Sequence, residues 1–450
     1  MPAAPADSLI YGQLFGDADT ARLFTDSAEI RAMLLVEGAL ARVQGRLGLI
    51  PAEAAAFIDR AAQEVVIDPS AMAAATARNG VPVPALLAAF RKGASAPAPM
   101  QYLHWGATSQ DIMDTGLALR LRPMLRLWDD RLAALLARLG ALAEATASLP
   151  MTARTYGQAA TPTSFGAVVA SWGWPVLGWH DRLPPLRDSL LAVSLSGAAG
   201  TLSAMGDAGP AVRAGLAAEL GLTDPGHSWH SDRSGPGQLA AFAAGLAGSL
   251  GKLAEDVLLL CQSGVAEVSL GGAGGASSTM PQKQNPVAAS ALVALARHVI
   301  GLAALVQGAA LHRQQRDGAA WFAEWLSLPQ LCICTGRMLS LADEIMASLA
   351  PDGAAMARAL EGGPEGALGL IHAEALSFAL ARQMPRPEAQ AVVSDLCAQA
   401  SATATPLLAL LAGRYPQTDW AATLAAAGLG QAPAEARAFA ARLHHIRPCA

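Results

Sequence analysis

A long apolar run without a polar face constrains the fold of this chain more than any other feature. The run from Gln238 to Ser263 is rich in leucine, alanine and glycine, and it carries charge only at Lys252, Glu255 and Asp256. A helix that is hydrophobic nearly all round must be buried nearly all round. A single subunit has no place to bury the second face of such a helix. The run therefore predicts a helix at the centre of an oligomeric bundle, in a homotetramer.

The composition predicts an all-α fold. Hydrophobic residues make up 53% of the 450 residues and charged residues only 15%, and alanine and leucine dominate. A composition rich in alanine and leucine and poor in β-branched residues favours helices, and the length allows two or three domains with a large core. We expect three helical domains: an N-terminal domain over residues 1–105, a central bundle of long helices over residues 106–350, and a C-terminal domain over residues 351–450.

The sequence argues against several classes of function. The net charge of −5 provides no basic surface for nucleic acid. Every long apolar run is interrupted by glycine, polar or charged residues, which argues against a membrane span, and the N-terminus does not read as a secretion signal. The five cysteines lack metal-binding or redox spacing, and we find no P-loop, dinucleotide-binding or nucleophile-elbow motif. We therefore expect a cytoplasmic protein that uses no metal or cofactor and binds neither nucleic acid nor membrane.

Residues 271–286, which read GGAGGASSTMPQKQNP, combine a run of small residues with a set of polar side chains. Asn285 suits a helix N-cap and Pro286 suits the first helical position, so we expect a helix to start there. A glycine-rich segment that ends at a helix N-terminus is a candidate anion site, and we expect Gly271–Thr279 to be poorly ordered without ligand. The alternative is a flexible loop between two helices. The polar groups of the segment are Ser277, Ser278, Lys283 and Asn285.

This segment resembles the signature of the fumarase/aspartase superfamily, which is usually written G-S-S-x-M-P-x-K-x-N-P. Residues Ser277 to Pro286 match every fixed position after the first, where Ala276 replaces the usual glycine. The resemblance implies a tetramer whose core is built from long central helices of each subunit. It also implies that each active site takes its conserved regions from three different subunits.

The resemblance implies a role for each matching residue of the signature. Ser277 corresponds to the base that takes the proton next to a substrate carboxylate. Lys283 and Asn285 correspond to the positions that bind a substrate carboxylate and stabilise the enolate. Ser278 and Met280 are further candidate substrate-binding positions.

A second polar cluster, Tyr102 to Asp111, precedes a long leucine- and alanine-rich run. Taken alone, Thr108 and Ser109 are typical helix-capping residues. Taken alone, His104 is typical of a loop histidine whose hydrogen bonds are made by neighbouring protein groups. The cluster resembles the first conserved region of the superfamily, H-x-G-x-T-S. That resemblance implies that Thr108 and Ser109 bind a substrate carboxylate. It also implies that His104 lines the site, where it is the next candidate to carry the proton after Ser277.

A third cluster, Arg154 to Gly166, joins two predicted helices and resembles the second conserved region, R-T-H-x-Q-x-A-x-P-x-T-x-G. Gln158 matches a substrate-binding position, but Tyr156 stands where several lyases of the superfamily carry a histidine. A phenol, whose pKa is about 10, does not replace imidazole near neutral pH. An aromatic residue at this position resembles the 3-carboxy-cis,cis-muconate cycloisomerase branch, which implies substrate contact by Tyr156. Simple packing of the ring is the alternative.

Two further stretches resemble the same branch. Trp229-His230 followed by Arg233 is one, and Arg316 before a W-x-x-E-W motif is the other. The resemblance implies that His230, Arg233 and Arg316 bind substrate. The alternatives are a salt bridge of Arg233 with Asp232 and a salt bridge of Arg316 with Glu324.

The combined interpretation is an enzyme that converts a small tricarboxylate to a lactone, as the cycloisomerase branch does in aromatic degradation. The runner-up is an adenylosuccinate lyase-like enzyme that releases fumarate by β-elimination. A catalytically inactive structural protein on the same scaffold is a third possibility, although the intact Ser277, Lys283 and Asn285 argue against it.

Overall fold

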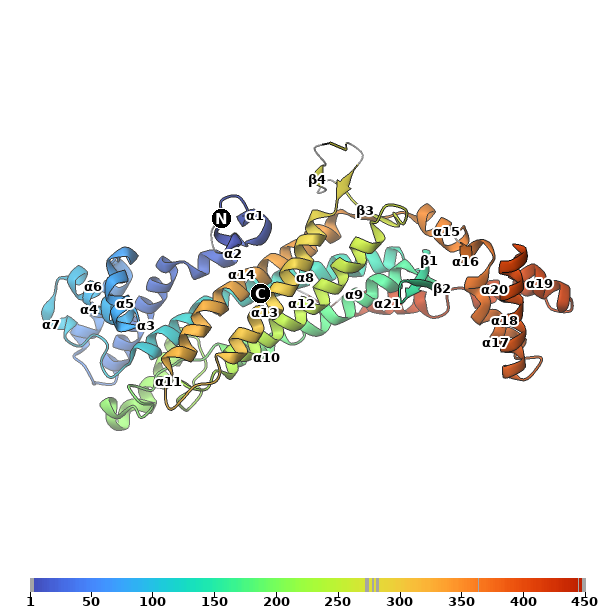
Figure 1. The fold of residues 1–450 in the computed structure, drawn as a ribbon. Coiled ribbons are helices and arrows are strands. Elements are labelled where there is room, and N and C mark those ends of the chain that lie inside the picture. Colours follow the sequence, from blue (N-terminus) through green and yellow to red (C-terminus); the bar gives the residue numbers. More distant parts are fainter. Residues whose placement is uncertain are drawn as a thin grey trace.

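Long helices lie side by side along one axis in the computed structural model, with shorter helices grouped at both ends (Figure 1). The structure describes residues 4–271, 275–276, 279–280, 283–362, 364–443 and 445–446. Within these residues the fold is built almost entirely from helices, as the composition predicts.

Most of the N-terminal helices form a group at one end of the molecule, whereas the first two α-helices pack against the long helices of the bundle (Figure 1). The N-terminal helices are η1 (Pro5–Asp7), α1 (Gly12–Phe15), α2 (Ala18–Ala21), η2 (Arg22–Phe24), α3 (Asp26–Arg46), α4 (Ala52–Glu64), η3 (Pro69–Met72), α5 (Ala73–Asn79), α6 (Val83–Ala94) and α7 (Pro97–Met100).

The central part contains the longest helices. Its elements are α8 (Ser109–Ala145), β1 (Pro150–Thr155), β2 (Gln158–Ser164), α9 (Phe165–His180), α10 (Leu183–Leu190), η4 (Ser203–Ala208), α11 (Gly209–Leu220), α12 (Ser234–Leu260), β3 (Val268–Leu270), β4 (Gly275–Ala276), β5 (Gln284–Asn285), α13 (Val287–Gly308), α14 (Gly318–Ser348) and β6 (Leu349–Pro351).

The C-terminal helices form a second end group, apart from the last helix. They are α15 (Gly353–Glu361), α16 (Pro364–Ala367), η5 (Leu370–His372), α17 (Ala373–Leu380), α18 (Arg386–Thr403), α19 (Leu407–Arg414), α20 (Trp420–Ala427) and α21 (Ala432–Leu443). The last helix, α21, packs back against α8 and α9.

Helix α8 determines the length of the bundle. Its 37 residues span about 55 Å at about 1.5 Å per residue. The helix continues through Pro123. Its inner face recurs at helical spacing, with Trp128, Leu132 and Leu139 fully buried. Helix α8 therefore connects two distant regions of the molecule. Each region carries polar residues that the sequence assigns to the active site.

Helices α12, α13 and α14 pack against one another and complete the bundle. One face of α12 is buried through Leu239, Leu246 and Leu253, whereas Leu259 on another face is 55% exposed. Helix α13 is long and apolar enough to cross a membrane, but half of its apolar stretch is buried inside the structure, as in the core helix of a bundle.

Three local predictions differ from the structure. The segment 150–164 is an antiparallel hairpin of β1 and β2 instead of a plain connection between helices. The helix predicted after it divides into α9 and α10. Helix α13 starts at Val287 with Pro286 as its N-cap, because Asn285 pairs with Gly275 in a short ladder and cannot cap the helix.

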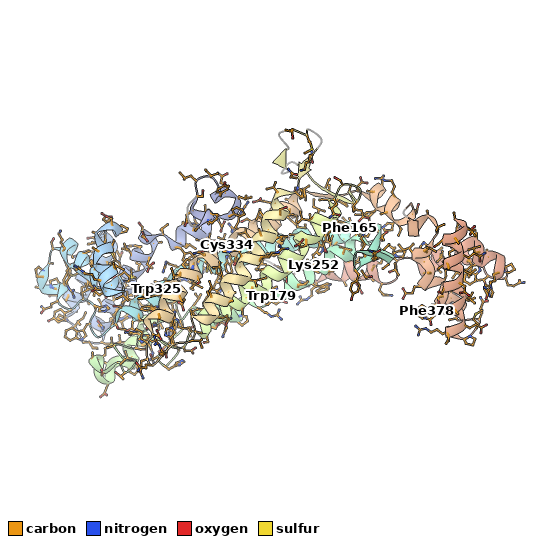
Figure 2. The ribbon with its side chains drawn as sticks, viewed as in Figure 1. Phe165, Trp179, Lys252, Trp325, Cys334 and Phe378 are labelled. Atoms are coloured by element: carbon orange, nitrogen blue, oxygen red, sulfur yellow. The ribbon has the colours of Figure 1, made fainter. Side chains whose placement is uncertain are left out.

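Within the part of the chain that the structure describes, the buried apolar residues form three clusters. One fills the bundle of α8, α9, α12, α13 and α14, a second joins α3, α4 and α6 to the start of α8, and a third lies among α17 to α20. Figure 2 places Phe378 in the C-terminal group and Trp325 towards the N-terminal group, far apart along the molecule. The domain boundaries at residues 105 and 350 stay predictions.

Candidate active site

The turn before α8 is organised around Asp111, which the structure buries completely. Thr108 is the N-cap of α8, and Asp111 belongs to a capping box with it. The same carboxylate also binds two further segments of the chain, and it therefore links three segments at one point. Its N–H donors are Thr108 N at 2.9 Å, Ser196 N at 2.8 Å, Gly197 N at 3.0 Å and His230 Nε2 at 2.7 Å.

Arg316 reaches the same place from the turn before α14. Its Nε donates to the Gln110 side-chain oxygen at 2.7 Å, and its Nη2 lies 3.4 Å from the Ala198 carbonyl and 3.5 Å from His230 Nδ1. Gln110 in turn donates to the His230 carbonyl at 2.8 Å. The structure thus brings His230 and Arg316 together, and it does not pair Arg316 with Glu324 as the alternative from the sequence had it.

The contacts of His230 indicate its tautomer. A guanidinium only donates hydrogen bonds, so the contact of Arg316 with Nδ1 favours the tautomer in which Nδ1 accepts and Nε2–H donates to Asp111. His230 is 3% exposed, and Asp111 and Arg316 hold its ring in one orientation.

Arg233 is paired with protein carboxylates. Its guanidinium binds Asp114 through Nη1 and Nη2 at 2.9 and 3.1 Å, and Glu324 through Nε and Nη2 at 2.9 and 2.6 Å. Burial alone would lower the pKa of Arg233, but the two carboxylates raise it further than burial lowers it. The residue is only 2% exposed, and it pairs with Asp114 and Glu324 instead of Asp232.

His104 lies at the edge of this cluster, on a turn with left-handed backbone (φ +66°). Its Nδ1 is 2.7 Å from Oε1 of Glu37, and the histidine side chain keeps 16% of its surface exposed. Gln44, two turns further along α3, donates to the carbonyl of Trp105 at 2.7 Å. The turn that carries His104 is therefore fastened to α3 at two points.

Tyr156 and Gln158 lie at the opposite end of α8, on the β1–β2 hairpin. Tyr156 (φ +53°) and Gly157 (φ +74°) form the tip of the hairpin, and the tyrosine side chain is fully exposed. Arg154 ties the hairpin to the segment before β3, because its guanidinium binds both oxygens of the buried Glu267 at 2.7 and 2.8 Å.

The signature segment leaves the bundle at this same end. It follows β3, which pairs with β6 after the last turn of α14, and its short strand β4 projects away from the helices (Figure 1). Lys283 and Met280 are exposed, and Asn285 is half-buried. Ser277 and Ser278 lie outside the described residues, as does most of the stretch from Gly271 to Thr279 that we expect to be poorly ordered.

The predicted site residues therefore form two groups within one chain. His104, Thr108, Ser109, His230 and Arg316 lie around the first turn of α8 or packed against it. Tyr156, Gln158, Lys283 and Asn285 lie beyond its last turn. About 55 Å of helix separates these two ends, which is several times the length of a small-molecule substrate.

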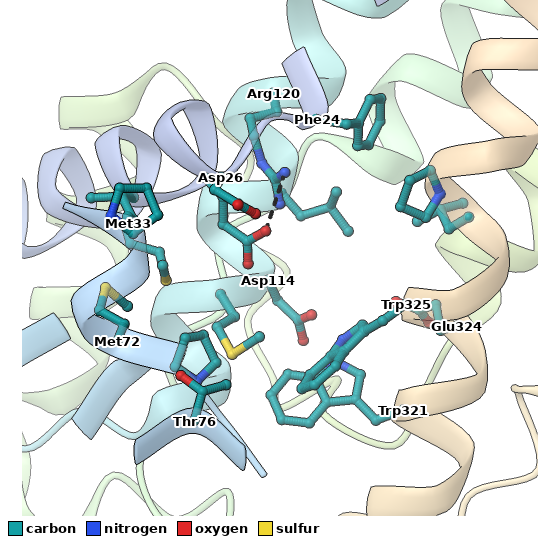
Figure 3. A pocket seen from close by; sticks show the side chains of 18 of the residues that line it. Phe24, Asp26, Met33, Met72, Thr76, Asp114, Arg120, Trp321, Glu324 and Trp325 are labelled. Carbon is teal, nitrogen blue, oxygen red and sulfur yellow. Dashed lines mark ion pairs between the residues drawn. The ribbon is translucent and has the colours of Figure 1, made fainter. Parts of the chain in front are cut away.

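A cavity of about 550 Å³ lies between α3, α8 and α14. Trp321 and Trp325 form one wall with Met33 and Met72 opposite, and Arg120 lies at its upper edge (Figure 3). Asp114 and Glu324 also line it, and these are the carboxylates that hold Arg233. Among the site residues assigned from the sequence that the structure describes, none lines this cavity.

Four residues that shape these groups were not assigned from the sequence: Glu37, Gln110, Asp111 and Glu267. Gln110 and Asp111 are the last two residues of the cluster Tyr102 to Asp111. Two polar residues at the start of an apolar helix could have been predicted to need buried hydrogen-bond partners. Glu37 and Glu267 are single acidic residues in apolar surroundings. Their partners are 67 and 113 residues away, which no local pattern reveals.

Comparisons with known proteins give a consistent picture. Residues 14–301 match the family described as lyase. A 3-carboxy-cis,cis-muconate cycloisomerase of Pseudomonas aeruginosa is 38% identical over 91% of this chain and 89% of its own length. A nitrosuccinate lyase of Streptomyces davaonensis is 36% identical over 78% of this chain and 76% of its own. The crystal structure of 3-carboxy-cis,cis-muconate lactonizing enzyme from Pseudomonas putida matches with a TM-score of 0.89 and 33% identity, covering 98% of this chain and all of that one.

Proposed function

The chain belongs to the lyase family of the fumarase/aspartase superfamily, and we propose that it is a 3-carboxy-cis,cis-muconate cycloisomerase. The observation that carries this proposal is the similarity to cycloisomerases over nearly the whole chain, in sequence and in fold. Tyr156 supports the same branch, because the lyases that must protonate an amine or hydroxyl leaving group carry histidine there. A carboxylate is a good leaving group, so a reaction that forms or opens a lactone needs no such acid.

The proposed reaction rearranges bonds within one molecule. A carboxylate oxygen of the substrate bonds to a carbon of the neighbouring double bond. The π electrons move towards the carboxylate on the adjacent carbon and form an aci-carboxylate. That α-carbon then takes a proton, and a lactone results with no atom lost. Ser277 delivers the proton in this scheme, and preorganised cations and N–H donors stabilise the doubly charged carboxylate.

The substrate has three carboxylates, and the proposed site offers partners from both ends of α8. Thr108, Ser109 and Arg316 serve one end of the substrate and Lys283 with Asn285 the other. His230 orients Arg316, and Gln158 lines the pocket. Arg233 has a different role from the one expected, since its burial and its two carboxylate partners favour a structural function.

We infer that the site is completed by other copies of the chain, in a homotetramer. The two groups of residues are too far apart to act on one small molecule within a subunit. The bundle also keeps an apolar outer face, where Leu259, Ile300 and Leu305 are 47–59% exposed. Gly248 of α12 and Gly301 of α13 have open space beside their α-carbons, which suits the close approach of a second helix.

The cytoplasm remains our proposal for its location. The four cysteines within the described residues are unpaired thiols, and burial raises the pKa of Cys334 to about 11. Buried thiols of this kind are stable in a reducing compartment.

The test is a direct assay with purified protein in the presence of EDTA. We expect loss of the ultraviolet absorbance of the diene when 3-carboxy-cis,cis-muconate is added. Adenylosuccinate, argininosuccinate, aspartate and malate are the comparison substrates. Turnover of adenylosuccinate without turnover of the muconate would replace the proposal with the β-elimination alternative. A folded, assembled protein that turns over none of these acids would favour the structural alternative.

A further inference from the structure

Glu37 occupies an unusual position for a carboxylate. It lies in the middle of α3 with its side chain fully buried, among residues of the apolar cluster that includes Val36 and Leu40. Its Oε1 contacts Nδ1 of His104 at 2.7 Å, and its Oε2 has no hydrogen-bond partner among the residues that the structure describes. A single histidine therefore provides all the hydrogen bonding that these residues offer the carboxylate.

Burying a carboxylate is unfavourable unless a cation is paired with it. A distance of 2.7 Å between nitrogen and oxygen is typical of a charge-assisted hydrogen bond. Burial alone would lower the pKa of His104, but the neighbouring carboxylates, Glu37 foremost, outweigh burial and the pKa is raised. Asp111 on α8 raises it further, and Arg91 on α6 lowers it.

The geometry also decides which nitrogen of His104 is available. Nδ1 is bound to Glu37, so only Nε2 is left for a ligand. The backbone of the turn is held on α3 by Gln44 as well as by Glu37, and it leads directly into Thr108 and Ser109. The exposed part of the imidazole therefore belongs to the same turn as the hydroxyl groups proposed to bind a substrate carboxylate.

We propose that Glu37 is a positioning residue that holds the His104 ring by Nδ1, so that the opposite Nε2–H is presented as a charge-assisted donor to a substrate carboxylate. His104 then does not act as a proton acceptor, and it does not substitute for Ser277. This inference rests on the proposed function only for the identity of the ligand. The Glu37–His104 pair itself can be tested without turnover.

The first experiment follows the titration of His104 by NMR in protein labelled at the histidine ring, with His104→Gln to assign the signal. We expect His104 in the wild type to titrate above the ordinary histidine value, which is about 6.5. In Glu37→Gln, which keeps the shape and removes the charge, we expect the pKa of His104 to fall by at least one unit. An unchanged titration in Glu37→Gln would overturn the proposal, whatever the substrate is.

The second experiment measures kcat/KM for the tricarboxylate from about pH 5.5 to pH 9 in the wild type and in Glu37→Gln. We expect the ratio of wild type to variant to be close to one at the acid end. It should grow to about tenfold or more at the alkaline end, the size of a lost hydrogen bond to a charged group. A defect of equal size at every pH would mean that Glu37 is only structural.

Gln44→Met is the matched control, because it removes the other fastening of the same turn and changes no charge. We expect its effect on kcat/KM to be the same at every pH. Glu37→Asp, which keeps the charge, should restore the alkaline limb in part. If Glu37→Gln fails to fold, Glu37→Asp still tests the proposal, since the longer distance from Asp to Nδ1 should lower the pKa of His104 by a smaller amount. Absence of that shift would count against it.

Discussion

Single residues carry the chemistry of this protein by their charge and their position. Ser277 is the residue on which the proposed reaction depends most, and we expect Ser277→Ala to lower kcat by at least about a thousandfold, in the upper range for loss of one proton-transfer group. The fold and the assembly should be unaffected, because the change removes one hydroxyl group. Steady-state kinetics beside circular dichroism and sedimentation give the answer. A variant with near-normal kcat would mean that another group carries the proton.

Tyr156 is the residue that separates the proposed branch from the other lyases. Its ring is fully exposed at the hairpin tip within the single chain. If the ring shapes the pocket in the assembly, Tyr156→Phe should keep kcat within about threefold of the wild type, because the volume and the aromatic face remain. Tyr156→Ala is the companion variant and should lower kcat/KM much more. A collapse of activity in the phenylalanine variant would instead assign proton transfer to the phenol.

The His104–Glu37 pair predicts a pH dependence of stability. Burial lowers the pKa of His104, but Glu37 and Asp111 together outweigh burial, so the folded pKa lies above the ordinary histidine value of about 6.5. A raised folded pKa stabilises the protein fully below the unfolded pKa, and this contribution is lost as the pH rises through the folded pKa. The stability advantage of the wild type over Glu37→Gln should therefore be larger near pH 6 than near pH 9. Chemical denaturation at the two pH values measures it, and a constant difference would contradict it.

The β1–β2 hairpin is the element that brings Tyr156 and Gln158 to the site, and its anchor is the Arg154–Glu267 pair. Glu267 is fully buried and Arg154 is about one-third exposed, so solvent screens part of the interaction. Glu267→Gln should cost about 1–2 kcal/mol of stability, below the range for a fully buried pair. It should also lower kcat/KM by about tenfold, since the hairpin loses its ionic anchor to the segment before β3.

Hydrogen exchange separates a local from a global effect of Glu267→Gln. We expect faster exchange confined to residues 150–164. The matched control is Asp343→Asn, which removes the more exposed pair of Arg138 and Asp343 between α8 and α14 and should change neither exchange in the hairpin nor activity. Uniformly faster exchange over the whole bundle would show that Glu267 supports the core instead of the hairpin.

The whole molecule presents an apolar face that a lone subunit leaves open. Leu305 on α13 is 59% exposed, and we expect Leu305→Glu to dissociate the proposed tetramer, because each buried charge in a symmetric interface occurs repeatedly and is costly. The dissociated chain should stay helical and lose activity, since its two groups of site residues no longer meet. Sedimentation, circular dichroism and the diene assay test the three statements.

Val66→Glu is the control for this change. Val66 is 95% exposed and lies in the N-terminal group between α4 and η3, away from the face formed by α12 and α13. The same substitution there should leave assembly and activity unchanged. A wild-type protein that sediments as a single monomeric species at micromolar concentration would remove the tetramer and the shared site together.

The sequence by itself determined the features that depend on neighbouring residues. The helical run of α12 and the capping by Thr108 were predicted correctly, because helical spacing and caps act within a few residues. The signature segment indicated the superfamily, since it packs many chemically special positions into a short stretch.

Tertiary structure alone decided the partners of the buried charges. Arg233 binds Asp114 and Glu324, which are 119 and 91 residues away, and this pairing favours the structural role that we propose for it. Asn285 pairs with Gly275 in a β-ladder, and Pro286 is the N-cap in place of the expected Asn285. The physical reason is the same in both cases. A buried charge or backbone group binds whichever partner the packing of distant elements brings within hydrogen-bond distance. A local sequence pattern does not show which distant residue that will be.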